Sequence, residues 1–381
     1  MKRIFILIVS ALLLTSCNSS TSQFEVKVSF DSDQNFTTPS LNHGASSEDV
    51  LFFTVESEML YCADLANNIC VPLCSKPECS HGAATCNAYC SIIHSLSLYD
   101  GGLYCFRSCG DGTFEIVDVF VDGTGRKKVK TFENDLITDF MSGVGDFSAL
   151  SHRGYYIMSG THHEVELGAA KDISKVIMCD LESQNDGKII YENSVLTKVT
   201  VQAYEKFLYI LAYSTEEIEI CRYDLSTQES EVVCHVSIPI FSPLMWVDNE
   251  KILIADRSEK ADVYIFDLDT NEFTLLYNFN EGSDISYYLY GFSNGNVIGG
   301  YPEGNKFKLC VKDERGNITL KTDMSINGID ESAPMYSFIL GSDNENIYIE
   351  SKVWSNENPA EYIFAVSLDD GGVKTLWSAE Y

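Results

Sequence analysis

One short stretch of the sequence gathers side chains that could bind a metal ion. Residues 70–90 hold five cysteines and a histidine, and part of the stretch follows a C-x4-C-x-H-x4-C spacing. Three thiolates and one imidazole make a Cys3His set, which suits tetrahedral zinc and leaves no coordination position open for catalysis. We therefore predict one structural zinc ion, with these ligands: Cys74, Cys79, His81 and Cys86.

The same cysteines allow a second interpretation. Of 13 cysteines in the sequence, eight lie between Cys62 and Cys109. Cysteines of exported proteins pair in an oxidising compartment, so disulfides could form among Cys70, Cys74, Cys79, Cys86 and Cys90, with Cys105 or Cys109 as further partners. By contrast, Cys179, Cys221 and Cys310 lie in apolar runs, where a free thiol serves as a small core side chain. Spacing alone leaves metal and disulfides both open.

The N-terminus indicates export and lipid attachment. Lys2 and Arg3 precede an apolar run of about eleven residues, which is too short to span a bilayer and is typical of a signal peptide. The end of this region, Leu14-Thr15-Ser16-Cys17, resembles the bacterial lipobox. The resemblance implies a signal peptide over residues 1–16 and acyl chains such as palmitate on Cys17. We expect the protein to be held by this lipid on a bacterial membrane, facing outside the cytoplasm; an ordinary secretory signal is the alternative.

Composition limits the class of protein and of partner. The chain has 381 residues, of which 45% are hydrophobic and 12% aromatic, enough for a large core. Its formal net charge is −30, and cleavage before Cys17 would change this to −32 by removing Lys2 and Arg3. So acidic a body argues against binding nucleic acid or attaching electrostatically to anionic lipid.

A recurring pattern divides the rest of the chain. A short apolar run ends in an acidic and an apolar residue, a polar turn follows, and another short apolar run comes after it. Such runs and turns predict antiparallel strands, and a repeat of this length predicts propeller blades. We expect an all-β fold, a β-propeller of seven blades (six or eight are possible), over residues 49–381. Residues 17–48 would be a lipidated tether, in which Phe24–Phe30 could add a closing strand. The equivalent repeat positions are Leu65, Val121, Leu181, Leu225, Leu268, Lys312 and Leu368.

This pattern resembles that of lipid-anchored bacterial β-propellers of the TolB-like or WD-repeat-like superfamily. The Lys-Pro-x-Cys-x-His-x4-Cys part of residues 70–90 is similar to an insert in propeller lipoproteins of gut-type Gram-positive bacteria. The Gly-His and Trp-Asp signatures of true WD repeats are missing from this sequence. The resemblance implies a fold and an anchor, and it implies no activity.

The sequence contains no Gly-rich phosphate loop, nucleophile elbow or HExxH motif, and we assign no catalytic or cofactor-binding residue. The first functional hypothesis is therefore a non-enzymatic binding scaffold for an extracytoplasmic protein or glycan. The alternative is a carbohydrate-active hydrolase or lyase with carboxylates at the channel mouth.

Four weaker candidates remain. We expect His162 and His163, with Glu164 and Glu166, to belong to an exposed polar loop rather than to a metal or acid–base site. Asp267-x-Asp269-x-Asn271 predicts a hairpin turn, and Ser108–Phe114 predicts a plain turn rather than an aspartate box. Aromatic residues could stack on sugars or fill blade cores: Trp246, Trp354, Trp377 and Tyr287–Tyr290.

Overall fold

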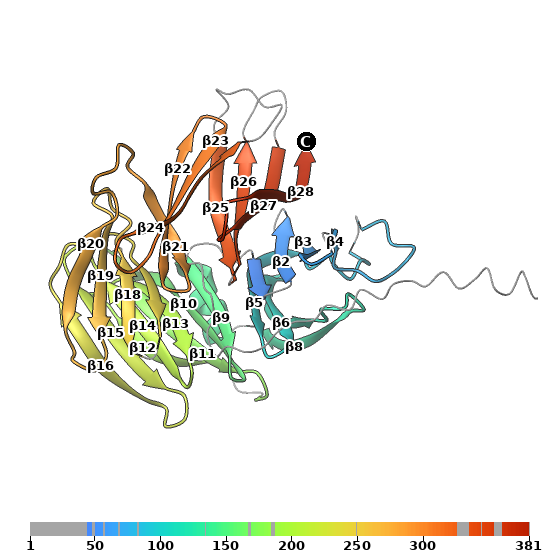
Figure 1. Cartoon of the computed structure of the whole chain (residues 1–381). Helices are drawn as coiled ribbons and strands as arrows, with labels where there is room; N and C mark the ends of the chain where they lie inside the picture. Colours follow the sequence, from blue (N-terminus) through green and yellow to red (C-terminus); the bar gives the residue numbers. More distant parts are fainter. Residues whose placement is uncertain are drawn as a thin grey trace, which may run out of the picture.

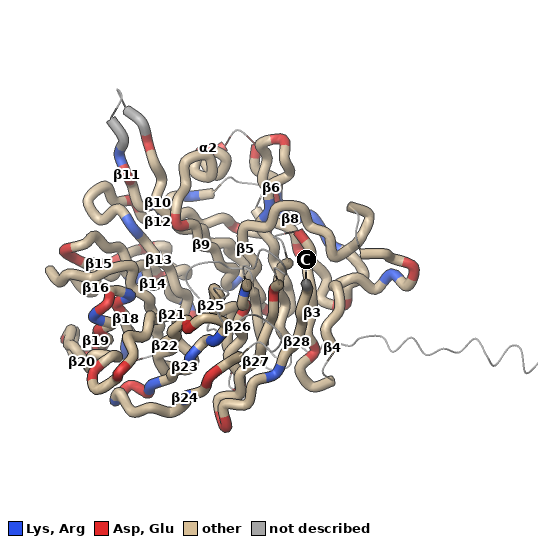
Figure 2. The backbone as a smooth tube through the Cα atoms, turned by 90° about the horizontal axis from the view of Figure 1, so that it is seen from above, with Lys and Arg blue, Asp and Glu red and all other residues tan. Residues whose placement is uncertain are grey.

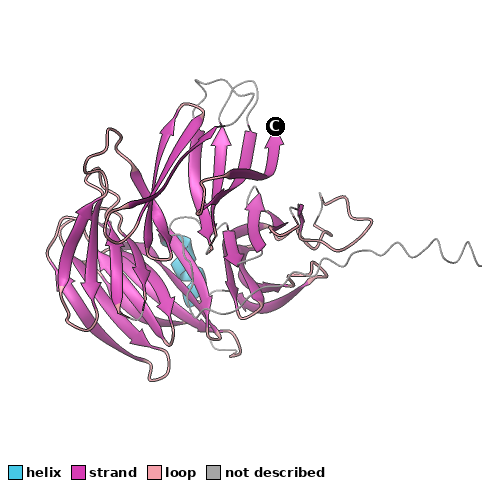
Figure 3. Cartoon of the chain, viewed as in Figure 1, coloured by secondary structure: helices cyan, strands magenta, loops and turns pink. Residues whose placement is uncertain are grey.

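The fold is a ring of seven four-stranded antiparallel sheets (Figure 1). The computed structural model describes residues 44–380, apart from 48–49, 56–57, 68, 82–83, 134, 167–168, 184–186, 249, 326–334, 344 and 354–359. The predicted all-β fold and the seven blades are both confirmed. Within the described residues α2 (Leu136–Gly143) is the one helix, drawn in cyan in Figure 3. No helix in that part of the chain is long and apolar enough to cross a membrane.

Each blade is one continuous stretch of chain, and its strands lie in sequence order. Blade 1 consists of β1 (Gly44–Ser47), β2 (Val50–Val55), β3 (Met59–Asp64) and β4 (Ile69–Pro72). Blade 2 consists of β5 (Ile92–Tyr99), β6 (Gly102–Ser108), β7 (Phe114–Val119) and β8 (Arg126–Phe132). Blade 3 consists of β9 (Val144–His152), β10 (Tyr155–Glu166), β11 (Ala169–Asp180) and β12 (Lys188–Asn193). Blade 4 consists of β13 (Lys198–Tyr204), β14 (Phe207–Tyr213), β15 (Ile218–Asp224) and β16 (Glu229–Val236).

The remaining blades repeat the same plan. Blade 5 consists of β17 (Leu244–Val247), β18 (Lys251–Ala255), β19 (Asp262–Asp267) and β20 (Phe273–Asn278). Blade 6 consists of β21 (Tyr288–Ser293), β22 (Asn296–Glu303), β23 (Lys306–Lys312) and β24 (Ile318–Ser325). Blade 7 consists of β25 (Met335–Ser342), β26 (Asn346–Val353), β27 (Ala360–Ser367) and β28 (Val373–Glu380). The first strands of the blades surround the middle of the ring, as Figure 2 shows for β5, β9, β13, β21 and β25.

The acidic residue of the sequence repeat makes the turn between the third and fourth strands. Asp224 Oδ1 accepts hydrogen bonds from the backbone N–H groups of Ser226 (2.7 Å) and Thr227 (3.2 Å). Asp267 does the same with Asp269 (3.0 Å) and Thr270 (2.7 Å). A short carboxylate that bonds its own backbone two and three residues ahead favours a tight turn. The sequence repeat therefore reflects a turn that recurs between the third and fourth strands of the blades. The predicted hairpin turn at Asp267 is one of these turns.

Alternation along the strands fills the spaces between blades. In β14, Leu208 and Ile210 are buried against blade 3, whereas Tyr209 and Leu211 are buried against blade 5. Seven clusters of buried apolar side chains result within the described residues, one between each pair of adjacent blades. Because a fully buried Leu, Ile or Phe contributes about 1.5–3 kcal/mol, the clusters are what hold the blades together.

Packing between blades 7 and 1 closes the ring. Leu51 and Phe53 of β2 are buried against Leu340 and Tyr348 of blade 7. The inner strands approach so closely that a Cβ on Gly44 would lie 2.9 Å from the Leu340 carbonyl oxygen. Both blades have four strands of their own within the described residues. The segment Phe24–Phe30, considered above as a closing strand, lies outside the described residues, as do the signal peptide and Cys17.

Candidate metal centre

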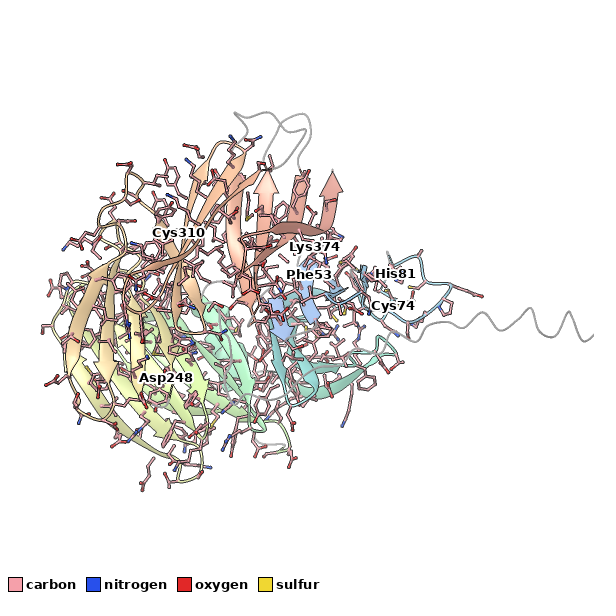
Figure 4. The ribbon with its side chains drawn as sticks, viewed as in Figure 1. Phe53, Cys74, His81, Asp248, Cys310 and Lys374 are labelled. Atoms are coloured by element: carbon pink, nitrogen blue, oxygen red, sulfur yellow. The ribbon has the colours of Figure 1, made fainter. Side chains whose placement is uncertain are left out.

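The four predicted metal ligands converge in the connection between blades 1 and 2. Cys74, Cys79, His81 and Cys86 each offer one ligand atom, and these four atoms all lie within 4.8 Å of one another. Sγ of Cys86 is 3.5 Å from Nδ1 of His81. Cys74 and His81 are labelled in Figure 4, in the insert that projects from the ring. These four residues, called the metal-ligand group below, are close enough together to hold a metal ion.

The first arm of the insert is held by blade 2. The Ser75 N–H donates to the Gly123 carbonyl oxygen (3.0 Å), and the Asn87 side-chain amide donates to the same oxygen (2.9 Å). Gly123 belongs to the turn between β7 and β8 and has a positive φ of 70°. A Cβ on Gly123 would lie 3.0 Å from the backbone nitrogen of Cys74. Only glycine combines this conformation with so close an approach.

The second arm of the insert returns along blade 1. The Leu60 N–H donates to the Ala88 carbonyl oxygen, and the Cys90 N–H donates to the Glu58 carbonyl oxygen, both at 2.9 Å. Arginines from blade 2 cover the carbonyl groups at the end of this arm. Arg107 donates to the Cys90 carbonyl oxygen (3.0 Å), and Arg126 donates to that of Tyr89. Backbone pairing on one side and guanidinium groups on the other therefore position the metal-ligand group.

Local bonds shape the loop between the two arms. The Cys79 N–H donates to the Lys76 carbonyl oxygen (3.2 Å), and the Lys76 ammonium donates across the loop to the Thr85 carbonyl oxygen (2.6 Å). His81 adopts a positive φ of 56°, which is uncommon for a residue other than glycine. These bonds bring three thiols and one imidazole together within residues 74–86, as the spacing suggested.

The thiols of the metal-ligand group differ in acidity. Burial would raise the pKa of Cys74, but hydrogen bonds from the backbone amides of Lys76 and Asn87, with contacts from Cys86 and Cys79, lower it overall. Burial raises the pKa of Cys86 to about 11. A metal ion binds thiolates, and backbone N–H groups directed at sulfur favour that form. Sulfur and imidazole ligands are the chemistry of zinc rather than of calcium or magnesium.

All twelve cysteines in the described part of the chain are free thiols. Cys179, Cys221 and Cys310 are buried in the cores between blades, as expected for small apolar side chains. No disulfide joins any two residues of the metal-ligand group in the described part of the chain.

The histidine pair does not lie in an exposed polar loop, and this expectation is wrong. His162 and His163 belong to β10, whose long hairpin with β11 extends beyond β9 and β12. Alternation along the strand separates the two rings. His162 is buried, with Nδ1 3.2 Å from the Phe140 carbonyl oxygen, whereas exposed His163 is 2.7 Å from Asp172. Glu164 pairs with Lys175 at 2.8 Å; the side chain of Glu166 lies outside the described residues.

Most of the other candidates serve the fold. Trp246 is buried between blades 5 and 6, and Trp377 packs edge-on against Phe53 with ring centroids 6.2 Å apart. In the predicted plain turn at Ser108–Phe114, Asp111 accepts from the Thr113 N–H at 3.0 Å. Trp354 lies outside the described residues.

Sequence analysis singled out Tyr288, within Tyr287–Tyr290, but missed that it belongs to a series of exposed apolar side chains on one face of the ring. Every blade begins with its innermost strand and has four antiparallel strands. The chain therefore enters and leaves each blade on the same face of the ring, and all the blade-to-blade connections lie on this face, called the connection face below. Five of them carry a large apolar residue at or just before the first strand, 48% to 68% exposed. A single apolar residue of this kind gives no signal in the sequence, because its place on the connection face is known only once the following strand is placed. The five residues are Ile92, Val195, Phe241, Tyr288 and Tyr336.

Solved structures similar to this one share its fold. A chain from a study of two prolyl endopeptidases superposes with a TM-score of 0.54 at 11% identity, covering 92% of this chain and 51% of that one. An acylaminoacyl peptidase from Pyrococcus horikoshii gives a TM-score of 0.53 at 12% identity, covering 91% of this chain and 54% of that one. This chain therefore spans about half the length of each peptidase. At such identities the likeness supports a β-propeller and nothing about activity.

The N-terminus matches a family model described as "Prokaryotic membrane lipoprotein lipid attachment site", over residues 1–18. No curated protein matches the sequence at a significant level. The chain is thus an exported, lipid-anchored membrane lipoprotein whose body is a seven-bladed β-propeller. The predicted anchoring and location are confirmed.

Proposed function

We propose that this lipoprotein is a non-enzymatic binding scaffold that holds an extracytoplasmic protein or glycan on its connection face. The observation that carries the proposal is the series of exposed apolar side chains at the starts of the first strands. Phe241 is 61% exposed, Tyr288 52% and Tyr336 55%. Exposed aromatic residues gathered on one face are typical of protein and sugar recognition.

Other features of the connection face support the same proposal. The three longest departures from the plain blade pattern begin and end there: the insert before blade 2, α2 before blade 3, and the β10–β11 hairpin. Connecting segments carried by a rigid scaffold are the usual location of binding residues. Acyl chains on Cys17 would hold the protein on the membrane. The length of residues 18–43 would allow a distance of at most about 90 Å between the membrane surface and the propeller.

The test compares full-length detergent-solubilised lipoprotein with a variant carrying Phe241→Ser, Tyr288→Ser and Tyr336→Ser. Both are applied to arrays of bacterial surface glycans and purified envelope proteins, and affinity for each retained ligand is then measured. We expect the triple variant to lose tenfold or more in affinity, since aromatic anchors dominate interfaces. The matched control carries Leu275→Ser and Ile318→Ser, which are 55% and 58% exposed on outer strands.

Equal binding by the triple variant and the wild type would overturn the proposal, as would an equal loss in the control. Cleavage of a retained glycan would support the carbohydrate-active alternative instead. Thermal unfolding of all three proteins confirms that any difference in binding is not a difference in folding.

We propose further that the metal-ligand group holds one structural zinc ion. Four protein ligands would complete a tetrahedral site, so the ion would stabilise the insert rather than take part in a reaction. Two observations support this assignment: the ligand atoms are within 4.8 Å of one another, and backbone amides lower the pKa of Cys74.

Elemental analysis of protein purified without chelator or reductant tests the zinc assignment. We expect about one zinc per chain in the wild type and little in His81→Ala. His235→Ala removes an exposed histidine that pairs with Glu217 at 3.1 Å, and it should keep its zinc. Unchanged zinc in His81→Ala would refute the ligand set.

A further inference from the structure

Two cysteines outside the metal-ligand group meet in the core between blades 1 and 2. Cys90 ends the second arm of the insert, and Cys105 lies in β6, opposite Leu96 of β5. Both side chains are fully buried, and their thiols are hydrogen-bonded to each other. Two sulfur atoms in contact are the geometric starting point for a disulfide.

Neighbouring cysteines elsewhere in the blades lack this arrangement. Cys62 pairs with Val71 across β3 and β4, and Cys70 pairs with Ala63, so the two thiols lie on opposite faces of blade 1. Cys221 and Cys234 are likewise on opposite faces of blade 4, one buried against blade 3 and the other against blade 5. Proximity along adjacent strands therefore does not bring those thiols together.

The surroundings of Cys90 and Cys105 make the two thiols chemically unequal. Arg126 Nη1 lies 3.5 Å from Sγ of Cys90, and Arg107 donates to the Cys90 carbonyl oxygen. The hydrogen bond from Cys105, aided by the charge of Arg126, lowers the pKa of Cys90 to about 7 against the effect of burial. The same hydrogen bond, together with burial, raises the pKa of Cys105. In such a pair Cys90 is the thiolate that attacks first, and the Cys105 thiol is in position to attack second.

We propose that Cys90 and Cys105 form a disulfide as the exported chain folds, joining the end of the insert covalently to blade 2. The Cys90 thiolate attacks one sulfur of an external disulfide, supplied by an oxidoreductase or an oxidised small thiol, and expels the other sulfur as a thiolate. Cys105, once deprotonated, attacks Sγ of Cys90 in the mixed disulfide and expels the second thiolate. The two cysteines lose two protons and two electrons, and the external disulfide becomes two thiols.

This inference goes beyond the binding scaffold and is independent of it. It also divides the cysteines between two kinds of chemistry. The thiols of the metal-ligand group bind an ion and stay reduced, whereas the fully buried pair of Cys90 and Cys105 is oxidised before the core closes over it. Metal and disulfide are then both present in one insert, each at its own residues.

Peptide mapping of the wild-type lipoprotein tests the pairing without any substitution. Protein exported and purified without reductant is denatured in acid, treated with chelator, and alkylated with a first reagent; after reduction, a second reagent follows. We expect the second label on Cys90 and Cys105, a linked peptide containing both before reduction, and the first label on Cys74, Cys79 and Cys86. The first label on Cys90 and Cys105, or a link from Cys90 to any other cysteine, would overturn the proposal.

Variants separate this pairing from the zinc proposal. Cys105→Ser should move Cys90 to the first label and leave the zinc content unchanged. Cys310→Ser, which removes a buried thiol in blade 6, should alter neither measurement. Cys90 that keeps the second label in Cys105→Ser would show that its partner is another cysteine and refute the assignment.

Discussion

The carboxylate of Glu115 ties together the side chains that hold the second arm of the insert. Only 7% of its side chain is exposed, and it pairs with Arg107 and Lys128, both at 2.7 Å. Arg107 in turn donates to the Cys90 carbonyl oxygen. Burial would raise the pKa of Glu115, but hydrogen bonds from Lys128 and Arg107 lower it overall. An ionised Glu115 is therefore part of what positions the metal-ligand group.

The lowered pKa of Glu115 predicts a pH-dependent contribution to stability. A carboxyl group with a folded pKa below its unfolded value stabilises the protein above the unfolded pKa, near 4.3. The contribution is lost as pH falls through the folded pKa. Glu115→Gln should lower the free energy of unfolding by about 2 kcal/mol at neutral pH, and this difference should shrink below about pH 4. Denaturant unfolding at a series of pH values measures it; a difference that stays constant with pH would contradict the prediction.

At this scale residue type and local spacing predicted the metal-ligand group, because all four ligands lie within one short loop. The contact of Cys90 with Cys105 was only one of several disulfide pairings considered, because it depends on the placement of β6. The repeat predicted a turn at Asp122-Gly123, but the contact of Gly123 with the insert was missed. Gly123 follows the insert by more than thirty residues, and a positive φ leaves no mark in sequence beyond the glycine itself.

Among the elements, the turns could be predicted better than the strands. Acidic residues such as Asp224 and Asp267 mark the third-to-fourth strand turn and revealed the blades. The first strands have no comparable mark, and β1 reads as four small residues, Gly44–Ser47, ahead of the predicted start at residue 49. The small residues of β1 allow its close approach to blade 7. The same small residues have low strand propensity, and this is why the sequence gives little sign of the strand. The sequence of the β10–β11 hairpin was interpreted as an exposed loop because one face of the hairpin carries a long series of polar residues.

The turn between β7 and β8 should be as important to the insert as the ligands are. Gly123→Ala adds a Cβ 3.0 Å from the backbone of Cys74 at a positive φ. Gly112→Ala has a positive φ of 86° with no atom within 4 Å of the new Cβ, so it measures the conformational cost alone. We expect Gly123→Ala to be less stable than Gly112→Ala by about 1–3 kcal/mol and to bind zinc less tightly. Thermal unfolding and a competitive chelator measure the two effects; equal behaviour of the two variants would show that the insert does not depend on this turn.

The whole molecule is dominated by negative charge. Acidic residues are spread along the chain all round the ring rather than gathered at one place (Figure 2). Ion pairs engage some of them, such as Asp224 with Lys206 at 2.7 Å, but 56 acidic residues face 26 basic ones. Like charges distributed over a compact body repel one another and favour expansion.

Salt should therefore stabilise the propeller. Screening shortens the reach of the repulsion to about 10 Å at 0.1 M ionic strength. We expect the midpoint of thermal unfolding to rise between about 10 mM and about 300 mM sodium chloride, and the rise to be smaller near pH 5, where carboxylates begin to protonate. Differential scanning calorimetry checks this; a midpoint that falls with salt would mean that ion pairs, rather than repulsion, dominate the surface.

The way in which the ring closes has a mechanical consequence. The chain that leads from the membrane anchor enters the fold at β1, which pairs with β2 through four residues, Gly44 to Ser47. The same strand forms one side of the seam with blade 7, and within the described residues that seam is closed by packing without a strand shared between the blades. A force transmitted to Gly44 therefore acts on a pairing of only four residues and on the seam at once. Under tension the ring would open there first, while the four-stranded sheets on the far side remain intact.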